Sequence, residues 1–194
     1  MNYLAHIYLS GNNRALQVGN FIGDFVKGRQ HENFPKGIQD GILLHRAIDD
    51  FTDHHPVFKD TVDLLRPTFN RYSGIIADMY YDYLLASNFK DYSPKTSLNY
   101  FAKNFYLSLL WYYRWLPKQV QGFIWHFIST NRSKQYGDYN GLHTALMLMH
   151  LHKSEAINPG LSISFLQTNE PVLLEKFQKF MPEVIDFVKD YQHK

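Results

Sequence analysis

Apolar residues recur every three or four positions along most of this chain, and no other property of the sequence limits its possible folds so strongly. That spacing is typical of amphipathic helices, whereas half-buried strands alternate apolar and polar residues. Only short runs such as GLSISFLQ (160–167) are ambiguous. The sequence therefore predicts an all-α fold. Helices are expected near residues 2–9, 13–28, 36–53, 56–69, 72–87, 95–113, 117–130, 138–152 and 170–191.

The number of domains follows from length and composition. A chain of 194 residues, of which 45% are hydrophobic, can bury one substantial core but not two. Turn signals at 93–94, 140–141 and 159–160 are not accompanied by a linker long enough to separate domains. We expect residues 1–194 to form a single compact helical bundle.

Several classes of site and location are excluded or disfavoured. The sequence has no cysteine, which excludes disulfides, thiolate metal sites and a cysteine nucleophile. It lacks a signal-peptide pattern at its start, and no run approaches the roughly 18 apolar residues of a membrane span. The net charge of +2 does not require a nucleic-acid partner. We expect a cytoplasmic protein that binds neither nucleic acid nor membranes.

The predicted helix 36–53 carries an unusual stripe. At 100° per residue, Ile38, Ile42, His45, Asp49 and Asp53 fall within a sector of about 80°. An apolar face thus continues directly into a histidine and two carboxylates. Carboxylates on such a face are costly unless they are paired, hydrogen-bonded or bound to a metal.

The predicted helix 72–87 repeats this pattern, with Asp78 and Asp82 one turn apart on a face that also contains Ile75 and Leu85. If the two helices pack together, their carboxylates gather near His45 and repel one another. A divalent cation would remove that repulsion.

Two further residues lie in apolar surroundings: His6 in NYLAHIYL and Asp24 in GNFIGDFVKG. Taken singly, a hydrogen-bonded core residue is the commoner explanation for each. Taken with the paired carboxylates and His45, they favour a metal site. Oxygen ligands with one or two imidazoles suit Mn²⁺, Mg²⁺ or Fe²⁺ better than a structural zinc. A buried ion-pair network or a structural ion is the alternative.

Four segments, in this order and spacing, resemble the acyl carrier protein phosphodiesterase family. The segments are MNYLAHIYLS, GNFIGDFVKG, FPKGIQDGILLHRAIDDFTDHHP and DMYYDYLL, all within about the first 90 residues. The family is similar to the all-helical HD-type metal-dependent phosphohydrolases, whose His/Asp centre commonly holds manganese. The resemblance therefore implies an HD-like bundle and a metal-dependent phosphodiesterase, with Mn²⁺ the first choice of cofactor and Mg²⁺ or Fe²⁺ the alternatives.

The resemblance also implies a substrate and a reaction. Members hydrolyse the phosphodiester that joins 4′-phosphopantetheine to a serine of holo-acyl carrier protein, giving apo-carrier and 4′-phosphopantetheine. The alternatives are an HD-like phosphohydrolase that acts on a nucleotide or another small phosphoester, and a helical binding module without activity.

Residue roles follow from the same match. The resemblance implies metal ligands at His6, Asp24, His45, Asp49 and Asp82. It implies catalytic roles for Asp49, Asp78, Asp82 and Arg46. The sequence departs from the family pattern at Tyr83, where relatives often have histidine, and in its diluted basic pattern towards the carboxyl end.

Docking of the carrier is expected to use basic residues. Each basic cluster alone is more simply explained as a solvated rim. Acyl carrier proteins are strongly acidic, however, so these side chains could steer one to the site. The residues are Lys27, Arg29, Lys36, Arg132 and Lys134.

Overall fold

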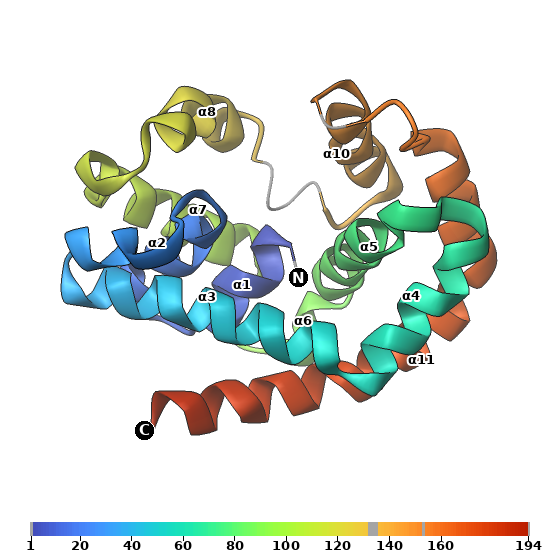
Figure 1. Ribbon diagram of the computed structural model, residues 1–194, viewed down its shortest axis with the longest axis horizontal. Coiled ribbons are helices and arrows are strands. Elements are labelled where there is room, and N and C mark those ends of the chain that lie inside the picture. The colour runs from blue at the N-terminus through green and yellow to red at the C-terminus, as the bar shows by residue number, and fades with distance from the viewer. Residues whose placement is uncertain (1, 132–135, 153, 194) are drawn as a thin grey trace.

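The computed structural model describes residues 2–131, 136–152 and 154–193, and within them every regular element is a helix (Figure 1). The predicted all-α class is confirmed. The elements are α1 (Tyr3–Leu9), α2 (Arg14–Ile22), η1 (Gly23–Phe25), η2 (Gly28–Asn33), α3 (Lys36–His54), α4 (Pro56–Phe69), η3 (Asn70–Tyr72), α5 (Ser73–Ser87), α6 (Phe89–Tyr92), α7 (Leu98–Trp111), η4 (Tyr113–Trp115), α8 (Lys118–Ser129), α10 (Tyr139–His152) and α11 (Pro159–Gln192).

Two predicted helices have the wrong extent. The helix expected over 13–28 ends at Ile22 and continues as two short 3-10 turns, η1 and η2, with Gly28 in the left-handed region at φ 52°. The helix expected to begin at residue 170 begins at Pro159, where Asn158 caps it by accepting the Leu161 N–H. The ambiguous run 160–167 is therefore helical.

Helices α2 and α3 approach each other at two glycines. A Cβ added to Gly19 would lie 2.2 Å from the carbonyl oxygen of Ile38, and one added to Gly41 would lie 2.4 Å from that of Leu16. Neither distance is possible for real atoms, so only glycine permits this packing. The crossing fixes the end of α2, and η1 after it, against the middle of α3.

The buried side chains of the described residues form two clusters. One is built mainly on α4, α5, α10 and α11, and the other on α2, α7 and α8. Helices α1 and α3 contribute to both, because Leu4 and Leu44 belong to the first cluster and Ile7 and Ile42 to the second. Helices α1 and α3 consequently lie at the seam between the two cores.

None of the helices, within the residues that the structure describes, combines the length and apolar character needed to cross a membrane.

Candidate metal centre

His6 of α1 is buried and held by an amide of α2. Its Nδ1 lies 2.7 Å from Oδ1 of Asn20, while the Asn20 Nδ2 donates to the His6 carbonyl and to Oγ of Ser10, each at 2.9 Å. Because the amide nitrogen is used as a donor elsewhere, Oδ1 accepts, and Nδ1 carries the ring proton. Nε2 of the neutral ring therefore presents a lone pair.

That lone pair faces Asp49 of α3, whose Oδ1 lies 3.1 Å from the His6 Nε2. Burial lowers the pKa of His6 to about 4, although the contact with Asp49 acts in the opposite direction. Near neutral pH a lone pair and a carboxylate thus face each other, which is unfavourable unless a cation lies between them.

His45 completes the group from the next turn of α3. Its Nε2 lies 3.1 Å from Oδ2 of Asp49 and 3.4 Å from Oδ1 of Asp24, and its ring stacks on His6 with the centroids 4.1 Å apart. Burial favours the neutral ring, but the two carboxylates outweigh it and raise the pKa of His45 to about 9. Without a metal, the proton on His45 supplies the positive charge of the site.

The two carboxylates differ in exposure. Burial opposes ionisation of Asp49, but the contacts with His45 and His6 hold its pKa well below the ordinary value. Asp24 of η1 is 62% exposed, and its contact with His45 likewise lowers its pKa. Both carboxylates stay charged at neutral pH, so both can contribute to cation binding.

Ligand atoms of His6, His45 and Asp49 all lie within 4.8 Å of one another. Two imidazoles and one carboxylate are a common donor set for divalent transition metals. In such sites the ring nitrogen of a histidine that does not bind the metal usually donates a hydrogen bond to a neighbouring residue. Asn20 accepts this hydrogen bond from His6. The residues fit a divalent metal.

An acidic pocket of about 250 Å³ opens beside this triad. Burial raises the pKa of Asp78, one of the residues that line it. The pocket thus places a carboxyl of raised pKa next to the possible metal ligands. Its lining consists of Asn2, Asp24, Asp49, Asp53, Ile75, Asp78 and Met149.

The contacts of Asp82, which is predicted as a metal ligand and catalytic residue, are with the backbone of α1. Asp82 is fully buried in α5, and its two carboxylate oxygens accept the N–H groups of Leu4 and Ala5 at 2.8 and 3.0 Å. Both oxygens are thus occupied by the first turn of α1, whose N–H groups have no partners within the helix. Asp82 positions α1, and with it His6.

Arg46, for which the resemblance implies a catalytic role, has its guanidinium bonded to backbone carbonyl groups. One terminal nitrogen donates to the carbonyl oxygens of Val26 and Gly28, at 3.0 and 2.8 Å. The side chain therefore fastens the segment between η1 and η2 to α3. Arg46 supports the placement of Asp24, and its catalytic role stays a prediction.

Tyr83, the residue that departs from the family pattern, contacts helices α10 and α11. Its hydroxyl donates to Glu170 of α11 at 3.2 Å, and its ring stacks on Tyr139 of α10. Within the described residues it ties α5 to the carboxyl-terminal half and does not line the acidic pocket.

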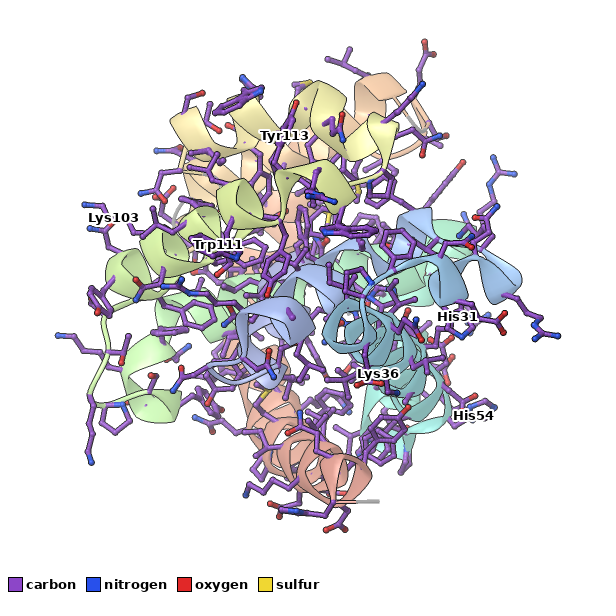
Figure 2. The ribbon with its side chains drawn as sticks, turned by 90° about the vertical axis from the view of Figure 1, so that its left-hand side faces the viewer. His31, Lys36, His54, Lys103, Trp111 and Tyr113 are labelled. Atoms are coloured by element: carbon purple, nitrogen blue, oxygen red, sulfur yellow. The ribbon has the colours of Figure 1, made fainter. Side chains whose placement is uncertain are left out.

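The basic residues expected to dock a carrier differ in their pairing. Arg29 pairs with Glu32 and Lys36 with Asp40, whereas no ion pair within the described residues involves Lys27. Figure 2 shows Lys36 on the outer face of its helix. Arg132 and Lys134 lie outside the described residues.

Two residues that position the site were missed by sequence reasoning. Asn20 is fully buried and orients His6. A Cβ on Gly23 would lie 2.3 Å from Cγ of His45, so the glycine leaves room for the imidazole. A buried asparagine in the apolar run GNFIG was the available signal for the first, and the second depends on tertiary packing alone.

The sequence of this chain is similar to those of a known protein family. The sequence model described as acyl carrier protein phosphodiesterase matches residues 1–184. Two proteins of that name, from Enterobacter sp. (strain 638) and Klebsiella pneumoniae (strain 342), are each 34% identical over 103 residues, which is 53% of either chain. The match thus spans about half the length of these relatives.

Another protein of that name, from Serratia proteamaculans (strain 568), is 25% identical over 99% of this chain and 100% of its own length. No solved structure matches, so the expected likeness to HD-type phosphohydrolases stays a prediction. The match over residues 1–184 is far more than half of the chain, and it agrees with the resemblance found in the four segments. The chain belongs to the acyl carrier protein phosphodiesterase family.

Proposed function

We propose that this protein hydrolyses the phosphodiester between 4′-phosphopantetheine and the serine of holo-acyl carrier protein, with a divalent metal. The observation that carries the proposal is the convergence of the His6 and His45 Nε2 atoms on the Asp49 carboxylate, beside an acidic pocket. Membership of the family supplies the substrate. The proposed location is the cytoplasm, which agrees with a sequence that contains no cysteine.

His6, His45 and Asp49 would hold the metal, with Asp24 as an additional oxygen ligand. Mn²⁺ is our first choice, and Mg²⁺ and Fe²⁺ are alternatives, because the donor set mixes imidazole with carboxylate. A divalent ion there would supply a Lewis acid for the phosphate and a water molecule of lowered pKa.

The remaining chemistry falls to residues of the chain. A water oxygen forms the new bond to phosphorus, the bond from phosphorus to the serine oxygen breaks, and one proton passes to that oxygen. Asp78 is our candidate to orient the water and take its proton, because burial raises the pKa of a carboxyl that lines the pocket. A base with a pKa closer to neutral holds and releases a proton more readily at working pH.

Incubation of the protein with holo-carrier and Mn²⁺, read by the intact mass of the carrier, tests the proposal. We expect loss of the phosphopantetheine mass, and no loss when a chelator is present. Asp78→Asn should slow turnover by roughly 10²–10⁴-fold while metal binding persists, as is typical for loss of a general base. An unchanged carrier mass with metal bound would instead favour a small phosphoester substrate.

A further inference from the structure

A second and larger pocket lies between the start of α1, α5, α8 and α10. Its volume is about 540 Å³, within the ~300–1,000 Å³ range of pockets that bury small organic ligands. Tyr3, Met79, Phe123, Phe127 and Leu148 supply much of its lining. In Figure 1, α8 and α10 stand on either side of the amino-terminal end of α1. The cavity is therefore apolar and joins helices from both cores.

This apolar pocket adjoins the acidic one. Asn2 and Met149 line both. Asp78 lines the acidic pocket, and Met79, the next residue, lines the apolar pocket. A ligand with one end in the acidic pocket would thus have its other end beside the apolar pocket.

Asn2 provides a polar contact at the junction. Its Oδ1 accepts the Tyr3 N–H at 2.9 Å and so caps α1. Its Nδ2 is buried and, among the described residues, has no hydrogen-bond acceptor. An unused buried donor is costly, and a ligand oxygen at this position would satisfy it.

The two pockets differ in charge as well as polarity. Four aspartates line the small pocket. Among the residues that the structure describes, the lining of the large pocket contains no carboxylate or ammonium group, and His126 is its one imidazole. Together they suit a molecule with a phosphate at one end and a long uncharged chain at the other. A nucleotide base or sugar would find few polar partners in the larger pocket.

We propose that the apolar pocket binds the uncharged arm that leaves with the phosphate, and that Asn2 Nδ2 donates to an oxygen of that arm at the junction. The identity of the arm rests on the function proposed above, from which it is the pantetheine chain. The pocket then selects substrates by the arm attached to the phosphate. This selection is separate from recognition of the surface of the carrier protein.

Filling the pocket tests this proposal. Leu148→Trp places an indole into the cavity from α10, and Met147→Trp is its matched control, because Met147 is the preceding residue on α10, is 38% exposed and does not line the pocket. Binding of free 4′-phosphopantetheine to the Mn²⁺-loaded protein is measured by calorimetry. Hydrolysis is measured with holo-carrier and with methyl p-nitrophenyl phosphate, a diester that has no arm.

Leu148→Trp should weaken 4′-phosphopantetheine binding and raise the KM for holo-carrier by about tenfold or more, the scale at which pocket shape discriminates ligands. Turnover of the small diester should stay within about twofold, as should every readout of Met147→Trp. A folded Leu148→Trp protein that binds 4′-phosphopantetheine as the wild type does would overturn the proposal, and so would equal losses on both substrates.

Asn2→Ser tests the junction separately, because serine keeps an oxygen that can cap α1 and removes the amide donor. We expect the KM for holo-carrier to rise by a larger factor than the KM for the small diester, because Asn2 also lines the acidic pocket; an unchanged KM for holo-carrier would refute the role of Asn2. If the wild type cleaves the small diester but not holo-carrier, the proposed function fails. In that case, the pocket proposal would still be supported if the wild type binds 4′-phosphopantetheine and Leu148→Trp does not. If the wild type does not bind 4′-phosphopantetheine, the pocket proposal is refuted.

Discussion

Asp49 faces two stacked imidazole rings, and its carboxylate connects the three possible metal ligands. Substitution of residues that hydrogen-bond to metal ligands typically lowers metal affinity by roughly 10–100-fold. Asp49→Asn changes a proposed ligand itself, so it should lower Mn²⁺ affinity by more than that. The helical circular dichroism spectrum should be retained, because the side chain lines a pocket. Metal content after equilibrium dialysis measures the effect.

Asp50→Asn, a change at an exposed neighbour on α3, serves as the control and should bind Mn²⁺ as the wild type does. Metal content unchanged in Asp49→Asn would contradict the assignment.

The protonation of His45 predicts how stability depends on pH once the metal is removed. Its pKa is raised from 6.5 to about 9 in the folded protein, so its stabilising contribution is complete below pH 6.5 and is lost as the pH rises through 9. Between those values the free energy of unfolding should fall by about 3 kcal/mol, at 1.36 kcal/mol per pKa unit.

Urea denaturation of the chelated protein at several pH values measures this decline. His45→Gln should flatten it over the same window, since the glutamine does not titrate. A wild-type stability that stays constant or rises from pH 6.5 to 9 would show that His45 is not protonated in the folded chain.

At the scale of residues, periodicity predicts that carboxylates lie on buried faces but not which partner each one meets. Asp78 and Asp82 occupy the same face of α5, yet one lines the acidic pocket and the other caps α1. Spacing within one helix cannot distinguish these roles, because both partners come from distant parts of the chain. The sequence predicts His6, His45 and Asp49 as metal ligands, whereas the contact of Asn20 with His6 requires the structure.

Among the helices, the crossing of α2 and α3 is the contact least able to tolerate change. Gly41→Ala should lower the free energy of unfolding by about 3 kcal/mol or more, because the added methyl group meets backbone rather than a movable side chain. Gly122→Ala, in α8, has nothing within 4 Å of the new Cβ and should stabilise the protein by ~0.5–1 kcal/mol. Thermal unfolding of the pair measures the contrast, and similar shifts of Tm in both variants would contradict the packing argument.

Helix boundaries could be predicted where local chemistry decides them. Pro56 begins α4 as expected, since proline suits the first turn of a helix. The first part of α11, residues 159–169, could not be predicted, because Pro171 suits a first helical turn and normally interrupts a helix that precedes it. Burial of Leu166, Leu173 and Phe177 along its length outweighs that local preference.

For the molecule as a whole, charge near the site should influence the encounter with an acidic carrier. Lys27 lies three residues after Asp24 and has no ion pair within the described part of the chain, unlike Arg29 and Lys36. Lys27→Ala should raise the KM for holo-carrier by about threefold at low salt, and the difference should vanish at high salt because exposed charges are screened.

Lys103→Ala is the matched control for Lys27→Ala. Lys103 is exposed, and Figure 2 shows it at the opposite edge of the view from His31 of η2, the turn that follows Lys27. Steady-state kinetics at several ionic strengths measure both variants. Equal effects would mean that net charge matters and that the position of Lys27 does not.

The cap that Asp82 places on α1 has a consequence for the order of events during synthesis. Helix α1 has seven residues, too few to persist alone in water. His6, His45 and Asp49 all leave the ribosome before Asp82, but α1, which carries His6, is capped by Asp82 only after α5 has folded onto it. A nascent chain that already contains all three residues of the triad therefore lacks the capped helix that positions His6. If the triad holds a metal, the choice of ion would be made by the finished protein, from the metals that its compartment then offers.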